Sequence, residues 1–473
     1  MSKQIRTAIL AQGTIIVSSC FLQAMLGIVQ FFGFFQASTV FQVTGSFDNP
    51  AGFAACLCVG FPFVGFLLLD KNKFVRYGGW MAGFVIALAV ILSQSRAGIM
   101  SIAFICFILL NMKFFQKRWM KCLSLVCFAL LLMGCYWMKK DSADGRLLIW
   151  RCSTDMVKDA PWFGHGTGSF EAHYMDYQAD YFRQHGRNRY SMLADNVKHP
   201  FNEYLGVLLN FGLFGLLMML AVAALLVRCY KKDSCMEKRI ALYSLLSVGV
   251  FSFFSYPFTY PFTWIVTLLC IVILTKEYIT KILARPMIKN AVCVLILLCS
   301  LGGIYKLVDR VMAEMEWGKI SKLALCGASE KTLPTYEKLE RKFEDNPYFL
   351  YNYAAILLEN KRYEESLQMA LQCRKYWADY DLELIIGESY QELDKQELAK
   401  KYYDNASMMC PSRFLPLYKL FQLYKDVGDR KRMLTVAKLI IDKPMKIKTS
   451  AIRMMKREME REQVRLLREE NNE

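Results

Sequence analysis

The chain has 473 residues, of which 55% are hydrophobic and only 21% are charged, and its mean hydropathy is +0.22. Soluble domains are about 45–50% apolar and about 25% charged, so this composition excludes an ordinary soluble protein. The net charge of +17 would also suit nucleic-acid binding. However, residues 1–306 hold 29 Lys and Arg against 14 Asp and Glu, whereas the remaining residues hold 30 and 28. The positive excess lies in the apolar part, which argues against nucleic acid and for membrane helices with basic flanks.

Apolar stretches recur along the first two thirds of the chain, each near the ~20 residues that a helix needs to cross a bilayer. They cover about 9–35, 51–69, 77–93, 97–112, 119–138, 203–227, 240–256, 258–275 and 288–306. We therefore predict an all-α fold, a polytopic membrane helix bundle of about nine spans, that occupies residues 1–307.

The connections between these spans alternate in charge. Basic residues fill the connections after the second, fourth, sixth and eighth spans, whereas residues 36–50 and 256–261 contain no Lys or Arg. Basic connections mark the cytoplasmic side. The long connection 139–202 and everything after residue 307 are then predicted to face outward, which in a bacterial inner (cytoplasmic) membrane means the periplasm.

Residues 346–444 show a repeat of about 34 residues after a predicted helical linker at 308–345. Small residues and aromatic residues recur at equal offsets in 347–379 and 380–413, and more weakly from Phe414 onward. This spacing is typical of tetratricopeptide-like repeats, in which helical hairpins stack side by side. An unrelated array of helical hairpins is the alternative. Residues 445–473 are predicted to form a charged C-terminal helix or tail.

The connection 139–202 contains all four histidines of the chain: His165, His173, His185 and His199. Histidine is the side chain best suited to proton transfer near neutral pH. A metal centre is the competing interpretation, but the spacings fit no HxxxH or HExxH pair on one helix face. We therefore predict no metal site and no cofactor.

Several further polar residues stand beside predicted spans. Arg146, Trp150 and Arg151 fall on an amphipathic helix that begins near residue 144 and is followed by the glycine-rich run 164–168, a flexible turn or a phosphate loop. Arg96 joins two spans, where an arginine either anchors the helix at the interface or serves a site. The connection closes on Lys198 and His199, with Asn202 and Glu203 at the start of the next apolar helix.

The order of these motifs resembles the O-antigen ligase family, which includes O-antigen polymerases. The resemblance covers about residues 40–275 and rests on Gly-Ser-Phe-Asp-Asn-Pro-Ala-Gly at 45–52, Ser-Arg-Ala-Gly at 95–98, Gly-Arg-x₃-Trp at 145–150 and His-x₂-Asn-Glu-Tyr-Leu at 199–205. It implies a metal-independent glycosyltransferase of the GT-C type. Such an enzyme takes a glycan from undecaprenyl diphosphate, within the membrane lipid, and passes it to lipid A-core, another glycan or a protein. Polymerase and protein O-oligosaccharyltransferase activities remain alternatives.

In this reaction arginines would hold the departing diphosphate and a base would activate the acceptor hydroxyl. We assign Arg146 and Arg96 to the diphosphate, with Arg151 as a weaker third, and His199 as the base. Asn202 and Glu203 would orient the imidazole or the acceptor, and Trp150 and Lys198 would bind substrate. The repeats would dock a protein partner. A membrane transporter, or a scaffold that displays repeats, is the non-enzymatic alternative.

Overall fold

The computed structural model describes residues 3–35, 40–113 and 117–471, and these contain helices and connections but no strand. The predicted all-α fold is confirmed. The chain divides into two compact units. The membrane unit comprises Met1–Ala143 and His199–Val292, and the repeat unit comprises Asp144–Lys198 and Cys293–Glu473.

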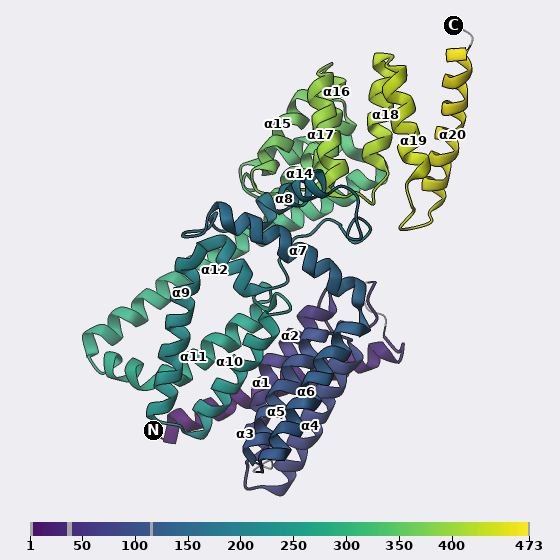
Figure 1. Cartoon of the computed structure of the whole chain (residues 1–473). Helices are drawn as coiled ribbons and strands as arrows, with labels where there is room; N and C mark the ends of the chain where they lie inside the picture. Colours follow the sequence, from purple (N-terminus) through teal and green to yellow (C-terminus); the bar gives the residue numbers. More distant parts are fainter. Residues whose placement is uncertain (1–2, 36–39, 114–116, 472–473) are drawn as a thin grey trace. The chain divides into compact units, whose positions relative to one another are not determined.

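The membrane unit is built from apolar helices, most of them long, with short helical segments between some of them (Figure 1). In chain order they are α1 (Lys3–Phe31), α2 (Pro50–Gly60), η1 (Phe61–Phe63), α3 (Val64–Leu68), α4 (Lys73–Leu92), α5 (Arg96–Lys113), α6 (Arg118–Met138), α9 (Glu203–Lys232), α10 (Met236–Ser252), η2 (Pro257–Thr259) and α11 (Pro261–Leu283). Helix α7 (Lys140–Asp159) begins here, and α12 (Pro286–Leu323) begins here as well.

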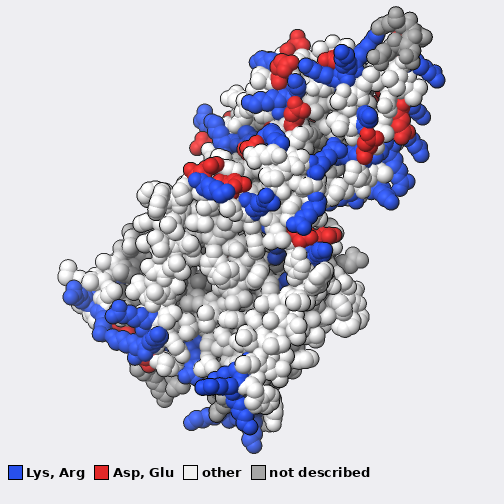
Figure 2. Space-filling view, in the orientation of Figure 1, with Lys and Arg blue, Asp and Glu red and all other residues white. Residues whose placement is uncertain are grey.

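Each of the nine predicted apolar stretches falls mostly on helix. Seven helices in the described residues are long and apolar enough to cross a membrane, and α5 is a shorter apolar helix over Arg96–Met112. The chain is thus a multi-pass membrane protein, whereas the number of nine spans stays a prediction. Figure 2 shows a broad uncharged surface over the membrane unit, with the Lys and Arg side chains in view gathered at one end.

Helix α2 is the centre of the membrane unit, because all its residues from Gly52 to Gly60 are buried. Its neighbours approach closely: a Cβ on Gly60 would overlap Cys20 Sγ of α1. On the other side Ser247 of α10 donates from Oγ to Cys58 O at 2.7 Å. Small residues and serine hydroxyls are the packing elements of membrane bundles. This packing fixes α2 and with it the turn that enters the helix at residues 44–50.

The repeat unit contains three antiparallel helix pairs, each joined by a short turn (Figure 1). The pairs are α14 (Pro347–Glu359) with α15 (Tyr363–Arg374), α16 (Tyr380–Glu392) with α17 (Gln396–Met409), and α18 (Leu415–Val427) with α19 (Arg430–Asp442). They follow the later part of α12, a π-helical turn η3 (Ala324–Ala328) and α13 (Ser329–Glu340), and α20 (Ser450–Asn471) comes after them. The helical-repeat fold is thus confirmed.

Small and aromatic residues pack against each other where the repeat helices cross. A Cβ on Gly387 would lie 2.5 Å from the Tyr403 ring, so only glycine admits that tyrosine between α16 and α17. Asn346 and Asp379 cap α14 and α16 by accepting backbone N–H groups of the first turn. The 34-residue spacing therefore reports a real structural period, since both the caps and the crossings recur.

The rest of the repeat unit is most of the connection 139–202. It holds α7 from Asp144 onward, α8 (Ser169–His185) and the segment 187–198. Gly164, Gly166 and Gly168 have φ values of 69°, 91° and 77°, a left-handed backbone that favours glycine. The glycine run is thus a sharp turn that ends α7 and starts α8.

Candidate functional site

The turn before α2 is held by Tyr260, which is far from this turn in the sequence. Asn49 caps α2 by accepting from Ala51 N and Gly52 N, and its Nδ2 donates to Tyr260 OH at 2.7 Å. Tyr260 OH lies 3.3 Å from Asp48 Oδ1. A Cβ on Gly52 would lie 2.5 Å from the Tyr260 ring, so this glycine permits the close approach. The Asp-Asn-Pro-Ala-Gly motif therefore packs against Tyr260 and hydrogen-bonds to it.

The same tyrosine-rich turn contacts the segment that carries the candidate base. The His199 and Tyr256 rings lie 4.4 Å apart between centroids, tilted by 31°, and the Phe201 ring meets Tyr256 edge-on at 5.3 Å. Phe258 N donates to Glu203 Oε1 at 3.0 Å. Residues 256–260 thus join two segments far apart in sequence, the 44–50 turn and the 199–203 helix entry, around a half-buried imidazole.

The two polar residues after His199 have structural partners. Asn202 is the N-cap of α9 and accepts from Leu205 N at 3.0 Å. Glu203 anchors the η2 turn through Phe258 N. Both side chains therefore hold the helix entry in place, and through it His199, which lies just before that entry.

Arg96 is a buried arginine at the start of α5, only 8% exposed. Its Nη1 donates to Lys139 O at 3.2 Å and its Nη2 to Ser142 Oγ at 2.9 Å. These bonds tie the guanidinium to the junction between α6 and α7. A fixed guanidinium costs little reorganisation when it meets an anion, which is what a phosphate-binding group needs.

Arg146, Trp150 and Arg151 lie on α7 within the repeat unit. Arg146 and Trp150 are four residues apart, on one face of the helix and half-buried. Arg151 is exposed and points elsewhere, with its guanidinium 5.3 Å from the Tyr181 ring centroid. The arginine and tryptophan that share a face could contact one ligand together, whereas Arg151 stacks on α8.

Lys198 lies against the repeats. Its Nζ stands 4.3 Å from the ring centroid of Tyr348 and 4.8 Å from that of Trp377. An ammonium over two aromatic faces is a cation–π site. The predicted substrate-binding lysine is therefore also a structural contact between the end of the connection and α14.

The three remaining histidines make local contacts. His165 Nε2 lies 2.8 Å from Met156 O, and the His165 and His173 rings are 5.9 Å apart. His185 Nδ1 lies 3.0 Å from Tyr181 O, and its ring stacks on Tyr181. Burial of the imidazole lowers the pKa of His173 below its usual value, and charge repulsion from His165 lowers it further. In the part of the chain that the structure describes, no three metal-ligating side chains cluster.

One protein-family model matches part of this chain. Residues 81–220 match the family model described as O-antigen ligase. That range contains all eight residues to which the sequence analysis assigned a role in the site: Arg96, Arg146, Trp150, Arg151, Lys198, His199, Asn202 and Glu203. The resemblance is thus confirmed over residues 81–220, and the match supports a role in glycan transfer at a membrane during polysaccharide biosynthesis.

Two other comparisons add little to the O-antigen ligase match. A search of curated proteins finds no match to this chain. A solved structure, the crystal structure of the yeast Tom70, aligns over 90% of each chain at 12% identity with a TM-score of 0.29, too low to bear on the fold.

Sequence reasoning missed the tyrosines of the 256–260 turn, since it used this connection only for its lack of Lys and Arg. Tyr256 and Tyr260 lie about 210 residues from the 44–50 motif that Tyr260 contacts. One signal was available: two tyrosines flank a Pro-Phe-Thr turn beside a span, where tyrosine commonly marks an interface. That signal does not say which residues the tyrosines meet.

Proposed function

We propose that this chain transfers a glycan from undecaprenyl diphosphate to an acceptor hydroxyl on the periplasmic face of the bacterial inner membrane, as an O-antigen ligase-like enzyme. The observation that carries this proposal is the family match over 81–220, which contains every candidate catalytic residue. The acceptor is lipid A-core, another glycan or a protein, and these share one chemistry.

The reaction is a displacement at the anomeric carbon. The acceptor oxygen forms the new C–O bond while the bond to the diphosphate breaks, and undecaprenyl diphosphate leaves with the electron pair. His199 takes the hydroxyl proton, and Arg96 and Arg146 bind the diphosphate as its negative charge increases. Trp150, on the same face of α7 as Arg146, contacts the donor. This assignment needs no metal, because guanidinium groups supply the charge stabilisation.

The His199 assignment is tested by transfer with purified full-length protein in lipid nanodiscs, supplied with undecaprenyl diphosphate-linked glycan and an acceptor. Loss of a general base costs about 10²–10⁴-fold, so His199→Ala is expected to lower kcat by at least 100-fold. His185→Ala is the matched control, since that histidine contacts only its own helix among the interactions described. Near-normal release of undecaprenyl diphosphate by His199→Ala would remove this residue as the base.

The arginine assignment is tested with lysine, which keeps the charge but loses the fork. Arg146→Lys and Arg96→Lys are each expected to lower kcat/KM by about 10–100-fold, on the scale of one charged hydrogen bond of 1.5–3 kcal/mol. The exposed Arg118 lies inside the same family match and serves as the control in Arg118→Lys. Equal turnover by Arg146→Lys and Arg118→Lys would make Arg146 structural.

Tyr256 is proposed as a positioning residue for His199. Its ring packs against the imidazole, so Tyr256→Phe keeps the contact and Tyr256→Ala removes it. Since misplacing a reacting group by about 1 Å can cost about 10²-fold, Tyr256→Ala is expected to lower kcat at least tenfold with KM little changed, and Tyr256→Phe is expected to restore it. Equal kcat values for the two variants would contradict this role.

The proposed orientation is tested in cells. In a cysteine-free background, exposed Cys326 restored alone is expected to react with an impermeant maleimide from outside the inner membrane. A cysteine placed at exposed Lys71, in a basic connection, is expected to react only after permeabilisation. The reverse pattern would put the repeats in the cytoplasm.

A further inference from the structure

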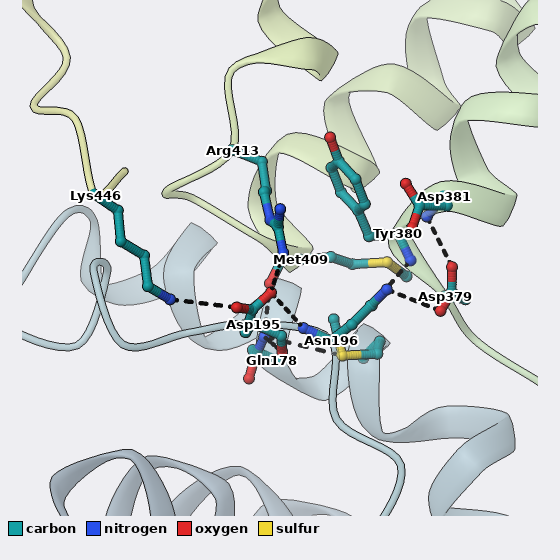
Figure 3. A network of polar contacts seen from close by, with 10 residues as sticks. Gln178, Asp195, Asn196, Asp379, Tyr380, Asp381, Met409, Arg413 and Lys446 are labelled. Carbon is teal, nitrogen blue, oxygen red and sulfur yellow. Dashed lines mark hydrogen bonds and ion pairs between the residues drawn. The ribbon is translucent and has the colours of Figure 1, made fainter. Parts of the chain in front are cut away.

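The repeat unit holds a segment of its own chain by buried polar contacts, shown in Figure 3. Gln178 of α8 is fully buried, and its Nε2 donates to Met409 O at the end of α17 at 2.6 Å and to Asp195 O at 3.2 Å. Its Oε1 accepts from Tyr174 OH at 2.8 Å. One amide thus joins three pieces of chain: α8, the segment 187–198 and the second repeat. A buried amide with all these partners is costly to displace.

A second amide contacts the start of α16. Asn196 Nδ2 donates to Asp379 Oδ2 at 2.8 Å, and Asn196 Oδ1 accepts from Tyr380 N at 3.2 Å (Figure 3). The other oxygen of Asp379 accepts from Asp381 N and Leu382 N as the helix cap. Asn196 is therefore bound by both a donor and an acceptor, which fixes the orientation of its side chain.

Ion pairs surround the two amides. Arg374 of α15 bridges Asp176 of α8 at 2.5 Å and Glu383 of α16 at 2.6 Å, and Glu383 is 1% exposed. Asp195 accepts from Arg413 at 2.8 Å and from Lys446 at 3.3 Å. The connection and the repeats thus carry complementary charges where they touch.

Backbone and aromatic contacts complete this contact surface. Ala378 N donates to Glu171 O at 2.8 Å, which links the end of the first repeat to the start of α8. Lys198 rests on Tyr348 and Trp377. Each of the three helix pairs is followed by a turn, and all three turns contact segment 169–198. These turns are residues 374–380, 409–413 and 443–446.

We infer that the C-terminal repeats are an internal clamp for residues 169–198, and that Gln178, Asn196 and Lys198 are positioning residues for glycan transfer. The catalytic part of this inference rests on the proposed function. Stacked repeats are stiff, whereas ordering a free connection costs conformational entropy for every residue that becomes fixed. Because the clamp forms when the chain folds, this entropy is lost on folding and not when substrate binds. It holds Lys198, the covalent neighbour of the proposed base His199, and it holds α8, on which Arg151 of α7 stacks.

A side-chain exchange tests the clamp with the full-length chain. Asn196→Asp sets a carboxylate against Asp379, and Asp379→Asn sets an amide N–H₂ against Asn196 Nδ2. The double variant restores the bond between positions 196 and 379 with donor and acceptor exchanged, and it keeps the other bonds. The carboxylate introduced at position 196 accepts from Tyr380 N and from the amide introduced at position 379, and the oxygen of that amide still caps α16.

Each single variant is expected to raise hydrogen exchange of the 187–198 amides at least tenfold and to lower kcat at least tenfold with KM within threefold. The double variant is expected to return both to within threefold of the original. A structural role alone would change the exchange rate but not kcat.

A matched pair of arginines provides the control. Arg362 also pairs with two carboxylates, Glu337 and Glu365, but both belong to helices outside segment 169–198. Arg374→Ala is expected to loosen 169–198 and lower kcat, whereas Arg362→Ala is expected to leave both unchanged. Unchanged exchange in both single variants would overturn the clamp, and faster exchange with unchanged kcat would overturn the positioning role. If the original chain transfers no glycan, the proposed function fails, and rescue of slow exchange by the double variant still decides the clamp.

Discussion

The two units differ in the side chains that they expose. On the membrane unit, leucines such as Leu217 and Leu268 are more than half exposed, while the core combines small residues such as Ala54 and Cys58 with large ones such as Phe63. In the repeat unit the core is aromatic, with Tyr336 fully buried, and the surface is charged (Figure 2). The difference indicates that lipid surrounds the membrane unit and that water surrounds the repeat helices α14–α19. A given side chain should then contribute differently to stability in each.

The largest effect is expected from an aromatic truncation in the repeat unit. Phe349 is fully buried and packs on Phe343 at 4.9 Å and on Trp317 at 5.6 Å. Phe349→Ala removes surface that water would otherwise contact and leaves a cavity, so it is expected to cost about 3–5 kcal/mol. Local hydrogen exchange of the full chain in nanodiscs measures this cost. Tyr376→Ala, at a half-exposed aromatic side chain, is the control and should stay within about 1 kcal/mol. Equal losses of stability in Phe349→Ala and Tyr376→Ala would contradict the role of Phe349 in an apolar core shielded from water.

The next effect sharpens the difference between the two surfaces. Leu220 is 55% exposed in the middle of α9, and Leu398 is 41% exposed on α17. Leu220→Arg places a charge in hydrocarbon, at a cost of about 2.5–3.5 kcal/mol, and is expected to reduce the inserted protein strongly. Leu398→Arg faces water and should change stability by no more than about 0.5 kcal/mol. The measurement is the yield of membrane-inserted chain. If Leu220→Arg inserts normally, α9 does not present this face to lipid.

Two buried lysines extend the comparison to charge. Lys238 in the membrane unit is paired with Glu277 at 2.8 Å. Lys443 in the repeat unit donates to Arg413 O, and burial followed by Arg187 lowers its pKa from 10.5 to about 7. A lowered folded pKa means that its contribution to stability is complete above pH 10.5 and is lost as the pH falls through about 7.

The original repeat unit should therefore become less stable from about pH 10 to about pH 7, and Lys443→Met should remove that slope. Since methionine has no charge to desolvate, the variant is expected to be more stable at about pH 7, by about 1–3 kcal/mol. Thermal unfolding of the full chain across this pH range measures the effect. Lys446→Met, at a more exposed lysine nearby, should leave the slope in place. If Lys443→Met keeps the slope of the original chain, Lys443 is not the group that titrates.

Much of the fold could be predicted from local pattern. The helix pairs begin at Pro347, Tyr380 and Leu415, close to the predicted repeat starts at 347, 380 and 414, because small and aromatic residues recur with the period and the first two pairs also carry side-chain caps. The predicted apolar stretches fall on helices for the same kind of reason, since hydrophobicity over about 20 residues is a local property. What pattern does not contain is which helix packs on which.

The candidate site shows this limit at particular residues. His199 and Arg96 stand out by type and place, and both lie within the matched family range. Tyr260 does not, because its partners Asp48 and Asn49 are about 210 residues away and only folding brings them together. Lys198 was predicted to bind substrate, and nothing in its neighbourhood in sequence points to the rings of Tyr348 and Trp377.

The smallest effect is the membrane counterpart of the first. Phe53 of α2 is fully buried, and a Cβ on Gly27 or Gly45 would lie within 2.6 Å of its ring. Phe53→Ala loses packing contacts and leaves a cavity, but lipid is as apolar as the core and no hydrophobic transfer is lost. The expected cost is about 1–2 kcal/mol, measured like that of Phe349→Ala. Trp264→Ala, at a half-exposed ring, is the control. If Phe53→Ala costs as much as Phe349→Ala, then packing alone stabilises both cores, and the surrounding solvent does not change what a buried ring contributes.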